Sequence, residues 1–454
     1  MKKTTLIIAL LFAVSGISGL VYELVWIRLL SHLLGGTTLA ISTVLAAFMG
    51  GLALGSHYFG KRVDQSSNPL RLYSFLELGV ATLGALVPLM VLILEPAYIK
   101  AASFLPDEMV AILRVFLTFV LLLPPTFLMG GTLPVLSRFL VRHSEKLGQN
   151  LGMLYAVNTI GAVGGIALSG FVLIPTIGLP GSTVFAVIGN LIAGLVALAL
   201  GRNISPSENP APTATKQKTP GINAARPELS PTFLAWAFAL TGFAALGFEL
   251  YWTRALHHFL GNSTYAFSAM LTTYLTGLAA GSWVGGRIAD RTSSPARTLG
   301  YIQAGLALSV AATLPLIWNW LPGLDSSIIN PDGWTSYLLR RFLLSFAVMA
   351  LPTFLSGMTF PLVNRIGIQG LEKIGGKVGH FYFANTAGSI LGSLAAGFII
   401  LPLLGTQKAI LATSLLSALV GLAILVKNSR RGPHDVWPGL AVVVVLVVLF
   451  APIS

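Results

Sequence analysis

The sequence predicts an all-α polytopic membrane protein made of two parallel six-helix repeats plus one extra C-terminal helix. Three observations predict this class. The chain is 55% hydrophobic and only 9% charged, whereas soluble domains carry roughly 25% charged residues. Apolar stretches long enough to cross a hydrocarbon core of about 30 Å recur along the chain. Finally, residues 15–202 are repeated at residues 241–428, 226 or 227 positions later.

The repeat is carried by residue types that apolar helices normally exclude. Such a long internal repeat predicts two structurally equivalent halves, and in a membrane protein it favours a transporter-like architecture. The polar and aromatic pairs that it relates include Glu23/Glu249, Trp26/Trp252, Arg114/Arg341, Tyr155/Tyr382 and Asn158/Asn385.

We predict thirteen membrane-spanning helices, six in each copy and one after them. They lie near residues 5–30, 37–59, 71–95, 110–137, 150–174, 181–201, 232–257, 264–288, 298–321, 341–363, 379–403, 407–426 and 437–453. Because six is even, both copies cross the membrane in the same orientation, as the two halves of major-facilitator transporters do. The predicted domains are the N-terminal repeat (1–201), a proline-rich cytoplasmic linker (202–231), the C-terminal repeat (232–428) and the extra helix (429–454).

The net charge of +13 follows membrane topology. Most of the Lys and Arg residues fall in the N-terminal tail and in alternate loops, which is the positive-inside pattern. It predicts a multi-pass membrane protein with a cytoplasmic N-terminus and an external C-terminus. Basic loops that face anionic lipid explain the charge, so we expect the lipid bilayer rather than nucleic acid as partner.

Sequence motifs for soluble catalysis are absent. The chain has no cysteine, which excludes disulfides, thiolate metal sites and cysteine nucleophiles. The glycines of residues 161–165 lie in an apolar helix without a preceding strand, so they predict helix packing and no dinucleotide site. We therefore predict no catalytic residue, no metal ligand and no cofactor, and leave open whether the chain serves an enzyme.

Glu23 and Glu249 are the strongest functional signal. A carboxylate within a membrane helix costs roughly 2.5–3.5 kcal/mol unless it meets a partner or water. Arg114 and Arg341, in the fourth helices, are predicted to pair with Glu23 and Glu249. Such pairs could lock the helices of each half together. Alternatively, the glutamates face a central cavity and bind a cation or a proton.

Four further residues are candidates because of their positions in the repeat. Glu77 occupies the position of Gln303 in the other copy, so it could supply the asymmetric part of a site; an interfacial position is the alternative. Asn158 and Asn385 lie in the fifth helices and favour interhelical hydrogen bonds and packing.

Two local patterns also appear in both copies. The fourth helices contain PPTFLMGGTLP (124–134) and LPTFLSGMTFP (351–361), which predict kinked or broken helices. Paired interruptions can mark a midplane site, and packing alone is the alternative. The loops GKRVD (60–64) and GGRIADR (285–291) resemble the signature loop of major-facilitator proteins, which implies a cytoplasmic charge clasp.

The doubled stretch SGLVYELVWIRLLSHLLGGTTLAISTVLAAFMGGLALGS and its mate resemble a known family. They are similar to the transmembrane region of fused major-facilitator/spermidine-synthase-like proteins of bacteria. In that family an aminopropyltransferase-like domain usually follows the membrane part, and this domain is absent from the present sequence. The resemblance implies a link to polyamines or related cations.

Three hypotheses follow. The first is a transporter that moves a small cationic metabolite, of the polyamine class, by alternating access. The second is the membrane module of a spermidine-synthase-like enzyme, which anchors or feeds a catalytic domain. The third is a scaffold or lipid-handling protein that does not transport. For the first hypothesis the predicted substrate-binding residues are Glu23, Trp26, Glu77, Arg114, Asn158, Glu249, Trp252, Gln303, Arg341 and Asn385.

Overall fold

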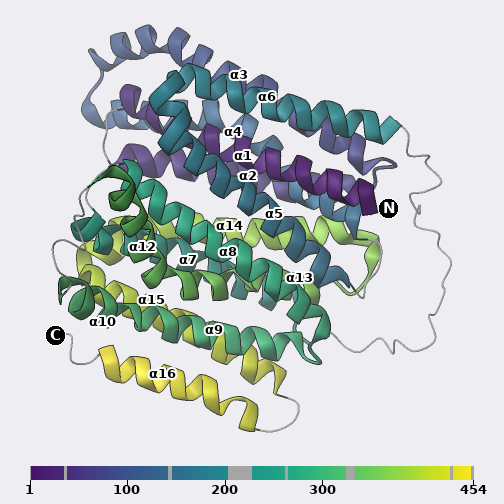
Figure 1. Ribbon diagram of the computed structural model, residues 1–454, viewed down its shortest axis with the longest axis vertical. Helices are drawn as coiled ribbons and strands as arrows, with labels where there is room; N and C mark the ends of the chain where they lie inside the picture. Colours follow the sequence, from purple (N-terminus) through teal and green to yellow (C-terminus); the bar gives the residue numbers. More distant parts are fainter. Residues whose placement is uncertain are drawn as a thin grey trace.

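The computed structural model describes residues 2–34, 38–141, 146–202, 228–260, 264–323, 333–429 and 433–450. Every regular element in these ranges is helical, which confirms the predicted all-α class. The helices form two bundles, with α1–α6 in one and α7–α16 in the other (Figure 1). Helices α1–α6 come from the first copy of the repeat and α7–α15 from the second, and α16 follows both. Most of the predicted linker, residues 203–227, lies outside the described residues.

The first half begins with four long helices. Its elements are α1 (Lys2–Leu34), α2 (Thr38–Val63), α3 (Pro69–Ala102), α4 (Asp107–Leu140), α5 (Leu147–Leu168), the π-helical turn η2 (Ser169–Leu173) and α6 (Ile174–Arg202). Helix α3 starts at the cap residue Asn68, whose side chain accepts a hydrogen bond from the Arg71 backbone N–H. The following proline has no N–H to leave unpaired, which makes it a good first helical residue.

The second half repeats this order with more interruptions. Its elements are α7 (Pro231–Leu260), α8 (Thr264–Arg291), α9 (Pro295–Ala311), α10 (Thr313–Pro315), η4 (Leu316–Trp320), η5 (Leu321–Gly323), α12 (Trp334–Gly357), α13 (Thr359–Gly367), η6 (Leu371–Lys373), α14 (Ile374–Ala395), η7 (Ala396–Ile400), α15 (Leu401–Asn428), η8 (Pro433–Asp435) and α16 (Trp437–Phe450). Ser294 caps α9 as Asn68 caps α3, by accepting from the Arg297 N–H. The local start signals of the two halves therefore correspond.

The fifth and sixth spans of each half are joined by a glycine in a left-handed conformation. Gly178 has φ 67° and Gly405 has φ 68°, a region that glycine alone enters without a steric penalty. The chain reverses at these two residues, and each reversal follows a π-helical turn at the same place in the repeat, Ser169–Leu173 and Ala396–Ile400.

The proline-rich fourth helices, predicted to be kinked or broken, are interrupted in one half only. Helix α4 runs without interruption through Pro124, Pro125 and Pro134. In the second half the helix ends at Gly357 and restarts at Thr359, with Met358 between them. A proline removes one helical hydrogen bond but does not force a break where the rest of the ladder holds. The interruption is therefore found in one half only.

Eight helices in the described part of the chain are long and apolar enough to cross a membrane. Two of these, Leu147–Arg202 and Leu371–Asn428, each contain two of the predicted spans, joined at Gly178 and Gly405. Helices α2 and α8 are not among the eight, and the apolar segment of α16 is shorter, Trp437–Leu449. The number thirteen therefore remains a prediction.

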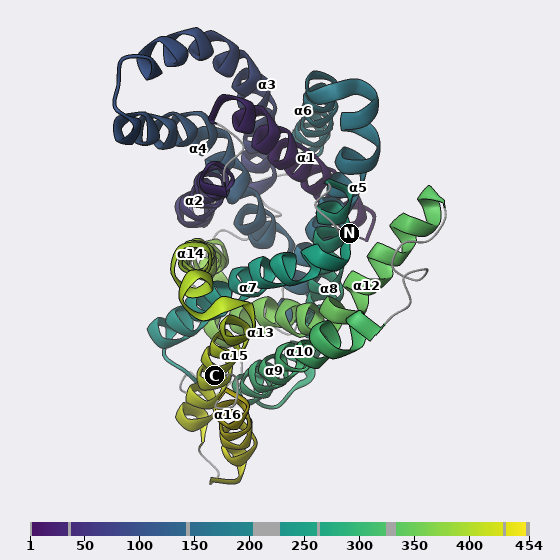
Figure 2. The same ribbon diagram turned by 90° about the vertical axis from the view of Figure 1, so that its left-hand side faces the viewer.

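Two helix pairs join the halves: α5 packs on α8, and α2 packs on α14 (Figure 2). Both contacts are close because they are lined by glycine. A Cβ on Gly152 would lie 2.5 Å from the Ser282 carbonyl oxygen, and one on Gly379 would lie 2.2 Å from that of Ser56. Small residues of this kind allow membrane helices to approach at backbone distance. The two interfaces are equivalent under the repeat.

Candidate functional site

The two intramembrane glutamates come together at the centre of the molecule. Glu23 on α1 and Glu249 on α7 lie within electrostatic range of each other. Both are only half-buried, although their neighbours Tyr22 and Trp252 are fully buried. None of the ion pairs formed within the described residues involves either carboxylate. The two carboxylates therefore lie near each other, partly exposed and without an ion-pair partner among the described residues.

Three tyrosines surround this acidic pair. Tyr382 on α14 lies within electrostatic range of Glu23 and of Tyr155 on α5, and Tyr274 on α8 lies within that range of Glu249 and Tyr155. The Tyr155 ring stacks on Phe360 at 4.7 Å between centroids. The Tyr274 hydroxyl donates to the Ala245 carbonyl at 3.1 Å. We call Glu23, Glu249, Tyr155, Tyr274 and Tyr382 the central cluster.

The predicted ion pairs of the glutamates are not formed. The Arg114 Nε donates instead to the Tyr98 hydroxyl at 2.7 Å. Arg341 is buried in α12, at 5% exposure, but no ion pair with Glu249 occurs among the described residues. The prediction matched the depths of these residues, but a long arginine side chain can reach an aromatic hydroxyl on its own side of the bundle. Helix depth alone did not identify its partner.

The tryptophans are also placed differently from the prediction. Trp26 and Trp252 are 0% and 1% exposed, so both are buried, whereas Glu23 and Glu249 are partly exposed. Trp26 stacks on Tyr22 at 5.0 Å, and the Trp252 Nε1 donates to the Thr313 hydroxyl at 3.2 Å. A residue three positions after a glutamate is rotated by about 60° around the helix. That rotation turns each tryptophan into the core of its own half.

Glu77 and Gln303 are buried inside their halves, away from solvent. Both are 0% exposed. Glu77 on α3 accepts hydrogen bonds from Ser15 on α1 and Asn190 on α6, whereas neither polar atom of the Gln303 side chain has a partner. Neither residue belongs to the central cluster in this conformation.

The two asparagines hold the fifth helices of each half against the first. The Asn385 Nδ2 donates to the Phe238 carbonyl on α7 at 3.0 Å. A Cβ on Gly16 of α1 would lie 3.0 Å from the Asn158 Oδ1. The interhelical hydrogen bond that the sequence favoured is therefore present for Asn385.

A pair of aspartates connects the halves at the ends that the charge pattern predicts to be cytoplasmic. Asp64, which follows α2, accepts from the backbone N–H groups of Gly375 and Gly376 at 3.0 and 2.7 Å. These two N–H groups belong to the first turn of α14 in the other half. Carboxylates are favoured there because helix N-termini present unpaired donors and a positive partial charge.

The same arrangement recurs with the roles of the two halves exchanged. Asp290, near the end of α8, accepts from Gly148 and Gln149 at the start of α5, at 2.9 and 2.8 Å. Each aspartate also lies near an arginine: Arg138 is 3.8 Å from Asp64, and Arg365 is 3.3 Å from Asp290. We call these two constellations the clasps. Each half therefore caps a helix of the other half.

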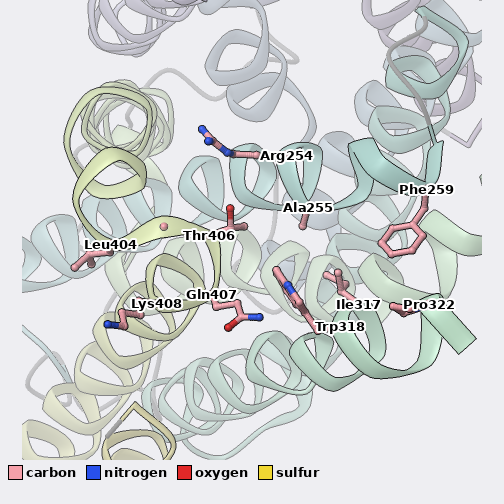
Figure 3. Close-up of a pocket in the computed structure, with 11 residues that line it drawn as sticks. Arg254, Ala255, Phe259, Ile317, Trp318, Pro322, Leu404, Thr406, Gln407 and Lys408 are labelled. Atoms are coloured by element: carbon pink, nitrogen blue, oxygen red, sulfur yellow. The ribbon is translucent and has the colours of Figure 1, made fainter. Parts of the chain in front are cut away.

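A separate cavity of about 590 Å³ opens in the second half, between the end of α7, the segment 317–322 and the start of α15. Figure 3 shows the Gln407 side chain extending toward Trp318. Arg254 and Lys408 lie on the left of this view, where Leu404 and Thr406 at the start of α15 also lie. Its cations would repel a cationic ligand. None of the predicted substrate-binding residues lines this cavity. Its lining includes Arg254, Phe259, Trp318, Pro322, Gln407 and Lys408.

Several of these features were not predicted from the sequence. Tyr274 occupies the position of Phe48 in the first copy. The hydroxyl that is present in one copy only is the sequence signal that could have identified Tyr274. The targets of Asp64 and Asp290 are backbone N–H groups of the other half, far away in sequence. His57 and His380 meet at 6.1 Å between ring centroids where α2 packs on α14. No motif spacing joins these two residues.

The sequence matches no protein-family model. It is 28% identical over 191 residues to polyamine aminopropyltransferase 2 of Streptomyces coelicolor. That similarity covers 41% of this chain and 32% of the relative. The chain thus spans about a third of the curated relative it matches. This relative agrees with the resemblance to spermidine-synthase-like fusion proteins.

The similarity to solved structures covers almost the whole chain. A bacterial homologue of the iron transporter ferroportin, crystallised in an outward-facing state, superposes with a TM-score of 0.60 over 93% of this chain and 98% of its own, at 13% identity. The human organic anion transporter MFSD10 (TETRAN) gives a TM-score of 0.56 over the same shares, at 16% identity. Such low identities establish the architecture rather than the substrate. The protein has the fold of the major-facilitator transporters.

Proposed function

We propose that this protein moves a small cationic metabolite of the polyamine class across the membrane by alternating access. The observation that carries the proposal is the central cluster, where Glu23 and Glu249 meet between the halves and have no cationic side chain as ion-pair partner among the described residues. Two carboxylates that face each other in a membrane interior repel and are costly to ionise. A bound cation with two ammonium groups removes both penalties.

The tyrosines of the central cluster fit the same ligand. Aromatic faces attract ammonium groups, and they also pack against the methylene chain that separates the charges of a polyamine. Tyr155 and Tyr382 are half-buried and come from opposite halves. A ligand between them would therefore touch both halves, as alternating access requires.

The clasps supply a second element of this mechanism. In the present conformation both are formed, so the halves are held together at their predicted cytoplasmic ends. Opening that end would require both aspartates to leave helix N-termini of the opposite half. A ligand that binds the open form more tightly shifts the equilibrium by its difference in affinity for the two forms.

Uptake of radiolabelled spermidine into proteoliposomes tests the proposal. Removing one partner of a buried charge interaction costs about 2 kcal/mol or more, which corresponds to roughly 30-fold weaker binding. We therefore expect Glu23→Gln and Glu249→Gln each to abolish measurable uptake at low spermidine concentration. Glu95→Gln is the matched control, because Glu95 is an exposed glutamate of α3.

Two results would count against the proposal. Uptake equal to that of protein-free vesicles would reject transport of this substrate class. Loss of uptake that is accompanied by unfolding of both glutamine variants would instead favour a scaffold stabilised by its internal carboxylates. Thermal stability is therefore measured on the same preparations.

The similarity to an aminopropyltransferase supports a second candidate function. In this candidate the chain is the membrane module of a spermidine-synthase-like protein and delivers a cationic substrate to, or receives a product from, a catalytic domain. Co-reconstitution with a soluble spermidine-synthase-like domain distinguishes the two. Uptake without that domain supports a transporter, whereas uptake only in its presence supports the module.

A further inference from the structure

Glu77 lies in a polar cluster that is separate from the central cluster. Its carboxylate accepts from the Ser15 hydroxyl of α1 at 2.7 Å and from the Asn190 Nδ2 of α6 at 2.5 Å. Both donors are neutral, and none of the ion pairs among the described residues includes Glu77. A fully enclosed carboxylate thus joins three helices without a neutralising side chain.

The surroundings of Glu77 contain several buried oxygens without a partner. The Tyr73 hydroxyl lies beside Glu77 and Ser15 but makes no hydrogen bond of standard geometry. The Tyr22 hydroxyl, on α1, lies within electrostatic range of Glu77 and is also without a partner. The Asn190 Oδ1 completes this set of buried, unpartnered atoms. Each of the three side chains is at most 2% exposed.

The other titratable groups near these helices belong to different interactions. Helix α6 carries no titratable side chain before Arg202 at its end. On α4, which packs on α3, Arg114 is bonded to Tyr98, and Arg138 reaches Asp64. On α1, Glu23 belongs to the central cluster. The groups that face Glu77 are therefore neutral hydroxyls and an amide.

The second half shows that the fold does not need a carboxylate here. Gln303 holds the equivalent position and is equally buried. The positions of Tyr22 and Tyr73 are taken by Phe248 and Leu299, which are also buried. The acid and the two tyrosine hydroxyls therefore occur together in one half and are missing together from the other, while the Ser15 hydroxyl has an equivalent in Thr241. This points to a function of the cluster rather than to a packing requirement.

The cluster offers hydrogen bonds to both charge states of Glu77. Hydroxyls rotate, so Tyr22 and Tyr73 can donate to the carboxylate beside Ser15 and Asn190. When Glu77 takes up a proton, its new O–H needs an acceptor, and the Asn190 Oδ1 provides one once the amide group turns over and exchanges its Nδ2 for its Oδ1. A single carboxylate among neutral oxygens balances one positive charge, and a divalent ion would leave an uncompensated charge in an apolar bundle.

We propose that Glu77 is a proton-binding site that is distinct from the central cluster and drives transport by gaining and losing its proton. Ser15 and Tyr22 belong to α1, the same helix that carries Glu23. The charge of Glu77 therefore sets how strongly α1 is held to α3 and α6. Because the site is enclosed, proton exchange requires these helices to separate, which couples the proton to a conformational change. This coupling role rests on the proposed transport function, whereas proton binding does not.

Infrared difference spectroscopy of the purified full chain during a pH titration tests proton binding without any transport substrate. We expect a carbonyl band of a protonated carboxyl group that titrates in the unmodified protein and disappears in Glu77→Gln. The band should persist in Glu95→Gln and in the Glu23→Gln/Glu249→Gln double variant. Identical difference spectra for Glu77→Gln and the unmodified protein would overturn the proposal.

Two further measurements keep the proposal testable if Glu77→Gln folds poorly. Ser15→Ala removes a donor to the carboxylate, so the midpoint of the same band should move to higher pH; an unchanged midpoint would contradict the assignment. Saturable binding of radioactive sodium that Glu77→Gln abolishes would also overturn it, in favour of an alkali-metal site. A titrating Glu77 without spermidine uptake would reject the proposed function and retain the proton site.

Discussion

The contacts between the halves follow the repeat, whereas the polar groups inside the halves do not. Asp64 and Asp290 make the same pair of backbone hydrogen bonds to the opposite half. By contrast, Glu77 sits among hydroxyls, and its equivalent Gln303 has no partner. The proposed transport would open and close the two interfaces together, which would constrain them to match each other. The interior of one half contacts only itself, so it can acquire a group that the other half lacks.

Removing both clasps should produce the largest effect. Loss of a helix-capping carboxylate costs about 0.5–2 kcal/mol, so the Asp64→Ala/Asp290→Ala variant should open the clasped end about tenfold or more often. The chain has no cysteine, so a cysteine introduced at Ser56, buried where α2 packs on α14, reports this opening through its rate of maleimide labelling. Glu95→Ala is the control. An unchanged labelling rate would mean that the clasps do not hold the halves together.

Small-to-large changes at the glycine contacts should have equal effects at the two interfaces. Gly152→Ala and Gly379→Ala each bring a methyl group against a backbone oxygen of the other half. Overpacking of this kind costs typically about 1–3 kcal/mol, which lowers the melting temperature in detergent. Gly19→Ala serves as control, because nothing lies within 4 Å of its Cβ position. A loss confined to one interface would break the equivalence.

Substitutions at Glu77 and at its repeat mate Gln303 should lower the free energy of unfolding by unequal amounts. Gln303→Glu places a carboxyl group where no hydroxyl equivalent to Tyr22 or Tyr73 is available, so we expect a loss of about 1–3 kcal/mol in unfolding free energy. Glu77→Gln should cost less, since Ser15 and Asn190 can still bond to an amide. Denaturation of the two variants under the same conditions measures the difference. Equal losses would show that the hydroxyl cluster does not favour the acid.

The clasp arginines should have the smallest effect. Arg138 and Arg365 are partly exposed, and exposed ion pairs contribute up to about 1 kcal/mol. Arg138→Gln and Arg365→Gln should therefore raise the labelling rate at the introduced cysteine only slightly. Added salt should reduce this difference because it screens the pair. A large effect that salt does not change would point to a structural role of the arginine.

The two-half architecture could be predicted because the repeat preserves residues that helix packing alone does not require. The same comparison identified Glu23 and Glu249, and the resemblance of the GKRVD and GGRIADR loops to the major-facilitator signature loop implied a cytoplasmic charge clasp. Helix starts at Asn68 and Ser294 carry ordinary capping signals. Each of these features depends on residues that are close together in the sequence or that recur in both copies of the repeat.

The partners of side chains could not be predicted in this way. Arg114 was matched to Glu23 by depth, yet the nearby Tyr98 hydroxyl binds it. The tryptophans were placed beside the glutamates, although a rotation of about 60° turns them into the core. The unbroken α4 shows that proline content does not fix where a helix breaks, since neighbouring helices stabilise the ladder. Such features depend on packing between segments that are distant in sequence.

The central claim is that a cation bound between Glu23 and Glu249 is coupled to the clasps. The most direct test is the maleimide labelling rate of Ser56→Cys, measured with and without saturating spermidine. The account predicts that spermidine changes this rate in the otherwise unmodified protein and leaves it unchanged in the Glu23→Gln/Glu249→Gln background. An equal response in both backgrounds, or no response where spermidine binding is measured independently, would contradict it.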